Sequence, residues 1–180
     1  EFGFRTDVNP RERLFNPELG GGALLDVGIY VVQLASMVFA GDVPQTIHAL
    51  AQLGETGVDE QSALLFGYEG GRMAQLSCAT RTTTHHEASV FGTEARIRLH
   101  APWWRGTMLS LYRSPTPEAD EVIELPFVGN GYNYEAAEVM ACIRAGKMES
   151  AVMPLGETLH LMETLDAIRA QWGLKYPMEL

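Results

Sequence analysis

The hydrophobic residues of this chain follow three successive patterns, which together predict an α+β fold. Residues 23–40 are apolar on almost every side, and a helix of this kind is normally buried. From residue 44 to about residue 125, the chain consists of short strand-like runs separated by turn residues such as those at 69–71. Helical spacing returns over residues 133–145 and 156–172. The order is therefore helix, sheet and two helices.

The strand-like runs predict an antiparallel sheet, because short turns join them and no helix lies between them. The turn that contains Gly70 and Gly71 predicts a hairpin, since glycine tolerates the positive φ that tight turns need. On either side of that turn, neither face of the strands is plainly polar. We therefore expect an open, predominantly antiparallel sheet that has helices on one face and a partner subunit on the other.

Each of the two later helices has an expected apolar face. In residues 133–145 this face consists of Ala136, Val139, Met140 and Ile143. In residues 156–172 it consists of Leu159, Met162, Leu165, Ile168 and Trp172. Gly146 is expected to end the first of these helices.

Composition and charge narrow the class of protein. The chain has 180 residues, 46% of them hydrophobic, which suits a single folded domain over residues 1–180. Its 13 basic and 23 acidic residues give a net charge of −10, which argues against nucleic acid or an anionic membrane as a partner. The longest apolar run is much shorter than the ~20 residues of a membrane span. Two cysteines, Cys78 and Cys142, are too few for a disulfide scaffold and predict a soluble, cytoplasmic protein.

The apolar helix at 23–40 carries the most informative polar residues. Asp26, Tyr30 and Gln33 are spaced i, i+4 and i+7, which places them within about 60° of arc on one side of a helix. A carboxylate that faces an apolar core is unfavourable unless it is paired or opens onto a cleft. Asp26 is therefore expected to accept a hydrogen bond from Tyr30 or from a ligand. Alternatively, Asp26 only binds backbone amides of the preceding glycine turn (Gly20–Gly22), and Tyr30 is a core residue.

Other candidate motifs indicate less chemistry. The glycine turn matches neither a Walker loop nor G-x-G-x-x-G, so we expect it to allow a close backbone approach to a neighbouring segment or ligand. The five histidines lack ligand spacing, and no metal site is expected. Tyr132 and Tyr134 begin a helix, where they can line a cleft or simply contribute to packing.

The segment GGGALLDVGIY (20–30) resembles the C-terminal domain of the Gfo/Idh/MocA family of NAD(P)-dependent oxidoreductases. VFGTEARIRLHAPWW (90–104) and GYNYEAAEVMACIRAGKMESAVMP (131–154) resemble later motifs of the same family, so the resemblance covers nearly the whole chain. Tyr30, where the family often has His, resembles the dimeric dihydrodiol dehydrogenase branch. The chain lacks an initial Met and begins as if within a strand, so we expect it to be part of a longer protein.

The resemblance implies a function for the longer protein. An N-terminal Rossmann domain, absent here, would bind NAD or NADP and supply the catalytic lysine, and this chain would contain no cofactor-binding residues. Tyr30 and Asp26 would be catalytic, and Gln33, Tyr132 and Tyr134 would bind the substrate, a sugar, polyol or trans-dihydrodiol with a reactive CH–OH group. Dimerisation would use the sheet face. Two alternatives are a structural dimerisation domain with a vestigial pocket and a stand-alone small-molecule binding module.

Overall fold

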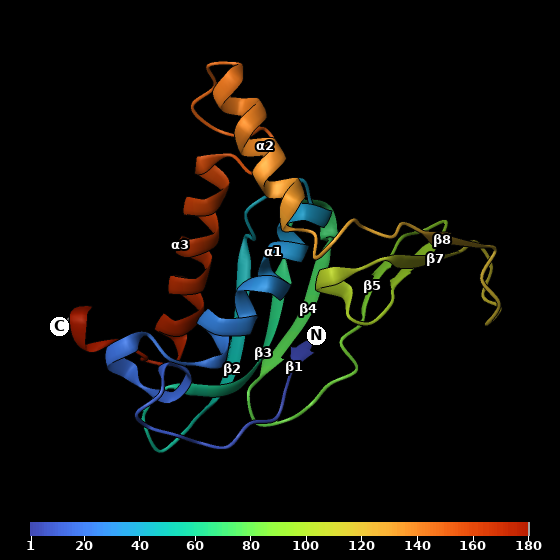
Figure 1. The fold of residues 1–180 in the computed structure, drawn as a ribbon. Helices are drawn as coiled ribbons and strands as arrows, with labels where there is room; N and C mark the ends of the chain where they lie inside the picture. Colours follow the sequence, from blue (N-terminus) through green and yellow to red (C-terminus); the bar gives the residue numbers. More distant parts are fainter. Residues whose placement is uncertain (180) are drawn as a thin grey trace. The chain divides into compact units, whose positions relative to one another are not determined.

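The computed structural model of the chain describes residues 1–179, which form two compact units. The first unit contains Glu1–Thr84 together with the C-terminal stretch that starts at Gly156. The second unit contains His85–Leu155, so it is inserted in the sequence between the two parts of the first (Figure 1).

A four-stranded sheet is the framework of the first unit. Its strand order is β1-β4-β3-β2, with β2, β3 and β4 antiparallel and the short β1 parallel to β4. The predicted hairpin is confirmed, because β3 and β4 are joined by a tight turn in which Gly70 and Gly71 have φ values of 73° and 77°. The strands are β1 (Phe2–Gly3), β2 (Thr46–Leu53), β3 (Asp59–Gly67) and β4 (Met73–Ala79).

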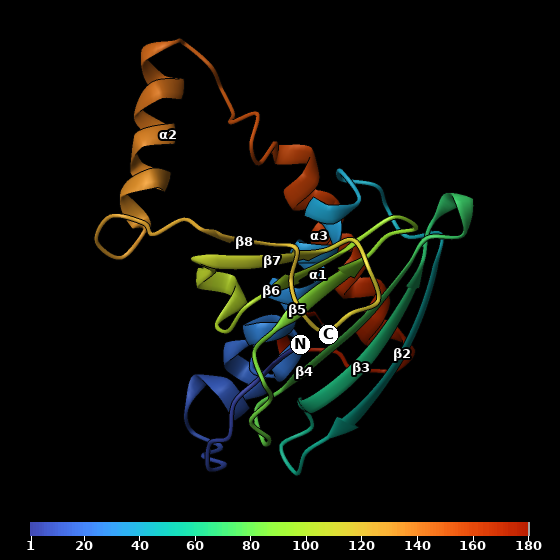
Figure 2. The same ribbon diagram turned by 90° about the vertical axis from the view of Figure 1, so that its right-hand side faces the viewer.

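Helices α1 (Ile29–Val38) and α3 (Leu155–Gln171) cover one face of this sheet (Figures 1 and 2). Because successive side chains of a strand point to opposite faces, burial alternates along β3. Leu64 and Phe66 face the helices and are buried, whereas Leu65 between them is exposed. The helix expected at 23–40 is present, but it begins with a π turn, η3 (Leu24–Gly28), before α1. The helices contribute the following side chains to the core: Leu24, Val27, Val31, Val32, Ala35, Leu161, Leu165 and Ile168.

The second unit contains a separate antiparallel sheet of order β5-β6-β7-β8. Its strands are β5 (Ala88–Phe91), β6 (Arg96–Leu99), β7 (Met108–Tyr112) and β8 (Glu121–Glu124). Helix α2 (Tyr132–Arg144) follows the sheet at the predicted position and extends away from it (Figure 2). Within residues 1–179 no side chain of α2 is buried, so its expected apolar face has no packing partner there.

The α+β class and the predominantly antiparallel strand pairing are confirmed, but the strands divide between two sheets instead of forming one. The physical reason lies at the edge of β4. Phe2 and Gly3 of β1 pair with Cys78 and Ala79, and the Thr84 amide then donates a hydrogen bond to the Gly3 carbonyl. Because β1 occupies this edge of β4, β5 does not pair with β4 and instead pairs with β6 in a second sheet.

The apolar face predicted for the last helix is partly wrong. Leu165 and Ile168 are buried as expected, but Leu159 and Met162 are 58% and 45% exposed. Steps of three residues rotate by about 60° each around an α-helix, which puts Leu159 and Ile168 on opposite sides. The face that packs on the sheet instead includes Leu161, which is 6% exposed.

One stretch, Pro17–Val38, is long and apolar enough to cross a membrane by length and composition. We expected no such segment because Gln33 interrupts the run. In the structure, 56% of its most apolar window is buried, and the segment packs on β4 and β1. A helix buried against a sheet in this way is typical of a protein core.

The rotated face of α3 predicts unequal effects of two matched substitutions. Leu165→Ala should lower the free energy of unfolding by about 2–5 kcal/mol, because it leaves a cavity in the core. Leu159→Ala, a control on the same helix, should change the free energy by no more than about 0.5 kcal/mol. Urea denaturation of both variants measures the difference. Equal losses would contradict the observed face.

Candidate functional site

The candidate site lies where the π turn η3 passes into α1. Within η3 the Ile29 amide donates to the Leu24 carbonyl, five residues earlier, whereas α1 has ordinary α-helical geometry. Asp26 lies in the wide π turn and Tyr30 in the first turn of α1. Single π turns inside helices occur frequently at functional sites. The relative orientation of the two side chains therefore depends on this junction.

Asp26 forms an ion pair with Arg13, a residue that the sequence reasoning missed. The Arg13 Nη2 atom lies 2.5 Å from Asp26 Oδ1. The Asp26 side chain is 19% exposed, whereas Arg13, from the 3-10 turn η1 (Arg13–Phe15), is 63% exposed. The expected hydrogen bond from Tyr30 to Asp26 is replaced by this pair in the described part of the chain. Arg13 thus neutralises the Asp26 charge beside the helix.

Tyr30 is not a core residue. It is 46% exposed. Its ring makes an edge-to-face contact with the ring of Phe2, with 5.4 Å between the ring centroids. Gln33, on the next turn of α1, is half-buried. The structure therefore brings Asp26, Tyr30 and Gln33 together on one helix, with Arg13 and Phe2 added from the N-terminal segment.

Tyr132 and Tyr134 lie in the second unit, at the start of α2. They are 67% and 52% exposed. The Tyr134 hydroxyl accepts a hydrogen bond from the Val128 amide, so this residue also orders the loop before the helix. Their participation in a site with Tyr30 stays a prediction.

A second missed residue, Asp59, is buried beside the glycine turn. Its side chain is 0% exposed, and Oδ2 accepts a hydrogen bond from the Leu24 amide at 2.7 Å. Its other oxygen, Oδ1, has no hydrogen-bond partner in the described chain and lies so close to Gly22 that a Cβ there would be 2.3 Å away. Burial raises the pKa of Asp59 to about 6, although the backbone amides that it accepts from partly oppose this shift.

The backbone-capping role proposed as an alternative for Asp26 therefore belongs to Asp59. A sequence signal for it existed, since Asp59 and Glu60 begin a strand-like run that becomes apolar from Ala63, and a charge buried there is unfavourable without a partner. The partner itself, the Leu24 amide, is 35 residues away in the sequence. No periodicity within β3 points to it.

The glycine turn also approaches a residue near the C-terminus. Tyr176 is 4% exposed, and its hydroxyl donates a 2.6 Å hydrogen bond to the Gly21 carbonyl. Desolvation raises the pKa of Tyr176 to about 12, and the negative charge of Asp59 adds to this effect. The close approach predicted from the glycines is confirmed, with Asp59 as the neighbouring segment at Gly22, whose φ is 123°.

The glycine turn does not fit a pyrophosphate. A phosphate at a helix start needs free backbone amides, but the Leu24 amide is bound to Asp59. The buried carboxylate would also repel an anion. Among residues 1–179, no group of three or more His, Cys, Asp or Glu side chains is placed to hold a metal ion.

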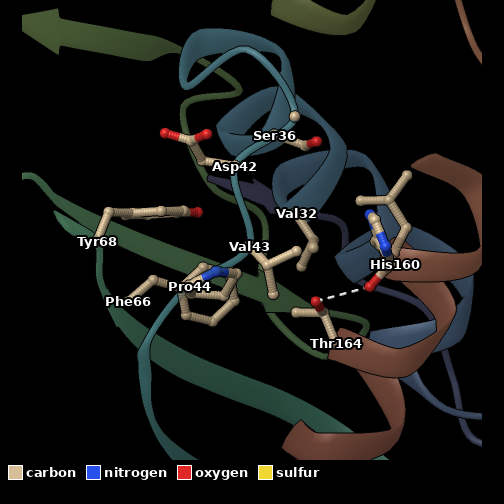
Figure 3. A pocket seen from close by; sticks show the side chains of 11 residues that line it. Val32, Ser36, Asp42, Val43, Pro44, Phe66, Tyr68, His160 and Thr164 are labelled. Atoms are coloured by element: carbon tan, nitrogen blue, oxygen red, sulfur yellow. Dashed lines mark hydrogen bonds between the residues drawn. The ribbon is translucent and has the colours of Figure 1, made fainter. Parts of the chain in front are cut away.

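A shallow hollow lies elsewhere in the first unit, between the end of α1, β3 and α3 (Figure 3). Three of its polar side chains are already paired within the protein. The Ser36 hydroxyl donates to Glu157 at 2.8 Å, and the Thr164 hydroxyl donates to the His160 carbonyl at 2.8 Å. Asp42 forms an ion pair with Arg72.

Comparison with known proteins decides the family. Residues 1–98 match the model of the GFO/IDH/MocA C-terminal domain, which is more than half of the chain. This chain belongs to the GFO/IDH/MocA family. A trans-1,2-dihydrobenzene-1,2-diol dehydrogenase of Xenopus tropicalis is 34% identical over 178 residues, which are 97% of this chain and 54% of that protein. The enzyme of the same name from Homo sapiens is 36% identical over 163 residues, 88% of this chain and 48% of the relative. The resemblance seen in the sequence is confirmed.

Solved structures show the same fold. The aldose-aldose oxidoreductase of Caulobacter crescentus, complexed with glycerol, matches with a TM-score of 0.79 at 21% identity, over 96% of this chain and 52% of its own. KijD10, a 3-ketoreductase of Actinomadura kijaniata in complex with NADP and TDP-benzene, matches with a TM-score of 0.75 at 19% identity, over 93% and 51%. This chain thus spans about half the length of these relatives.

The burial of Asp59 predicts a pH-dependent stability. An unfolded Asp titrates near pH 3.8, and folded Asp59 near 6, so the folded state binds more protons between these values. Stability from this group therefore falls as the pH rises through this window, and ionised Asp59 costs roughly 3 kcal/mol at pH 7. Cys78 and Tyr176, which interact with Asp59, have pKa values of about 12 and do not titrate there.

Denaturation of the wild type and Asp59→Asn at pH 4 and pH 7 isolates this effect. The wild-type stability minus that of the variant should decrease by roughly 2–2.5 kcal/mol between the two pH values, because an unfolded Asp is already partly ionised at pH 4. A difference that is constant with pH would show that Asp59 is not the titrating group.

Proposed function

We propose that this chain is the substrate-binding domain of an NAD(P)-dependent oxidoreductase that acts on CH–OH groups of a sugar, polyol or trans-dihydrodiol. The observation that carries the proposal is the ion pair of Arg13 and Asp26 beside the accessible Tyr30 at a π-turn junction. An accessible phenol beside a neutralised carboxylate suits the proton transfer that accompanies oxidation of an alcohol.

The relatives support the reaction class. Several are named trans-1,2-dihydrobenzene-1,2-diol dehydrogenases, and others are sugar oxidoreductases. Their structures contain glycerol in one case and NADP with TDP-benzene in another. Such ligands present hydroxyl or sugar-like groups and fit the polar side chains of Gln33, Tyr132 and Tyr134, which we propose as substrate-binding residues.

Tyr30 and Asp26 have separate roles in this proposal. Tyr30 takes the proton of the substrate hydroxyl during oxidation and returns it during reduction. Asp26 orients the substrate or Tyr30. Arg13 offsets the negative charge of Asp26, because an unpaired carboxylate would oppose ionisation of a nearby phenol. A lysine from the other half of the protein would add the cation that a phenol needs near neutral pH.

The dinucleotide, NAD or NADP, would supply the hydride acceptor from a binding site in the other half of the protein. The glycine turn of this chain does not fit it, because Asp59 occupies the amide that a pyrophosphate would need. Both cysteines, Cys78 and Cys142, are free thiols, which supports the proposed cytoplasmic location.

The role of Tyr30 can be tested in the full-length protein with trans-1,2-dihydrobenzene-1,2-diol and glucose as substrates and NAD or NADP as oxidant. Tyr30→Phe should lower kcat by ~10²–10⁴-fold, the usual contribution of general acid–base catalysis. Its stability should change by less than about 1 kcal/mol, because the ring and its contact with Phe2 remain. Near-normal turnover across the pH range would instead favour a vestigial pocket and a purely structural domain.

We further propose that the chain forms a dimer through the uncovered face of its first sheet. Leu50, Leu65 and Met73 are 76%, 54% and 79% exposed on β2, β3 and β4. The strand register places them on the same face, since Leu50 pairs with Ala63 and Met73 with Gly67, two residues either side of Leu65. An apolar face of this kind is typical of an interface.

Sedimentation velocity at micromolar concentration tests the dimer. The wild type should have the mass of a dimer, and a Leu50→Lys, Leu65→Lys double variant should have the mass of a monomer, because burying two ammonium groups opposes association. The matched control is Leu19→Lys, which changes an exposed leucine outside the sheet and should leave the dimer intact. A monomeric wild type would contradict the proposal.

A further inference from the structure

The glycine turn connects the parts of the proposed site to one another. The Gly22 amide donates to the Leu14 carbonyl at 2.9 Å, next to Arg13, and the Gly22 carbonyl accepts from the Asp26 amide at 3.3 Å. Gly22 is therefore hydrogen-bonded to the backbone of Asp26 and to that of Leu14, the residue that follows Arg13. A shift of Gly22 would move the two charges relative to each other and would change the start of the helix that carries Tyr30.

Two buried side chains hold this turn from distant parts of the sequence. Asp59 accepts from the Leu24 amide with Oδ2 and lies against Gly22 with Oδ1. Tyr176 donates to the Gly21 carbonyl at 2.6 Å. These two side chains thus contact Gly21, Gly22 and the nearby Leu24. Both side chains are buried.

The chemistry of Asp59 exceeds what simple packing needs. A charge-assisted hydrogen bond to the Leu24 amide is stronger and more directional than a neutral one. Oδ1, however, has no hydrogen-bond partner in the described chain, so burial of the ionised group is unfavourable. An apolar side chain of similar size would fill the same space without this cost, but it could not fix the position of the Leu24 amide.

We infer that Asp59 is a positioning residue of the proposed active site, holding the glycine turn in the one arrangement that aligns the Arg13–Asp26 pair with Tyr30. This inference rests on the proposed function. Asp59 itself touches no substrate, and it acts through the backbone of Gly22 and Leu24. Asp59 therefore affects the rate of the chemical step more than the binding of substrate.

A double-mutant cycle in the full-length protein tests this role with the two substrates named above. Asp59→Asn should lower kcat by about 10- to 10²-fold, because small displacements of catalytic groups have effects of this size, and KM should change by less than about 3-fold. In a Tyr30→Phe background the same change should lower kcat by less than about 3-fold, since the group that it positions is already absent. Losses that multiply independently would overturn the inference.

The matched control is Glu60→Gln, the same chemical change at the next residue of β3. Glu60 is also buried, but its carboxylate lies against Gly54 and pairs with Arg81, away from the glycine turn. Its kcat should stay within about 2-fold of the wild type. An equal loss in both variants would indicate a general effect on the sheet and would overturn the specific role of Asp59.

Hydrogen exchange at the Leu24 amide provides a readout that does not depend on activity. Its protection should fall by at least about 10-fold in Asp59→Asn, because a neutral acceptor replaces a charged one. Unchanged protection would contradict the inference. If Tyr30→Phe retains normal turnover while the Leu24 amide loses protection in Asp59→Asn, the proposed function fails, and the contact of Asp59 with the turn is verified separately.

Tyr176→Phe is a second variant for the case that Asp59→Asn does not fold. It removes only the hydroxyl that donates to the Gly21 carbonyl and keeps the buried ring. It should lower kcat by about 3- to 10-fold, and this loss should also disappear in the Tyr30→Phe background. A kcat within 2-fold of the wild type would overturn the inference.

Discussion

The carboxylate of Asp59 is buried where water cannot solvate it, and the start of the site helix compensates for this charge with the Leu24 amide. This constraint determines much of the first unit. The helix start must lie beside the first residue of β3, and residue 22 must be glycine, because a Cβ would lie 2.3 Å from Oδ1 and φ is 123°. The apolar core between the helices and the sheet can then form on one side of this contact.

The site has a buried part and an accessible part. Asp59 and Tyr176 are closed off from solvent, whereas Arg13 and Tyr30 are exposed. Such a division suits a site that must keep its geometry while it meets a substrate from outside. The chain belongs to the GFO/IDH/MocA family, and the relatives that it matches are about twice as long.

Helices α1 and α3 cover one face of the first sheet (Figures 1 and 2). The edge of β4 is occupied by β1, and the strands that follow form a second sheet. The outer face retains exposed leucine and methionine side chains on β2, β3 and β4. The proposed catalysis uses residues on the helix side and the proposed association uses the outer side, so the two proposals can be tested independently.

Much of the fold could be predicted from the sequence, because its determinants are local. The all-apolar segment at 23–40, the glycine hairpin at 70–71 and the strand-like runs each act within about 20 residues, and the structure contains the corresponding helix, turn and strands. Asp26 and Tyr30 could be selected for the same reason, since a polar stripe on an apolar helix is a local pattern. The face of α3 could have been corrected from helical geometry alone, because Leu159 and Ile168 are nine residues apart and point in opposite directions.

The remaining features depended on contacts between distant residues. The pairing of Asp26 with Arg13, of Asp59 with Leu24 and of Tyr176 with Gly21 joins residues 13, 35 and 155 positions apart. The division into two sheets depended on β1, which pairs with β4 more than 70 residues later in the chain. A sequence pattern reports the preference of each residue for burial, but not which distant group will satisfy a buried charge or occupy a strand edge. By itself, this sequence determined the helices, the strands and the polar stripe, and only the tertiary structure decided which residues hold that stripe in place.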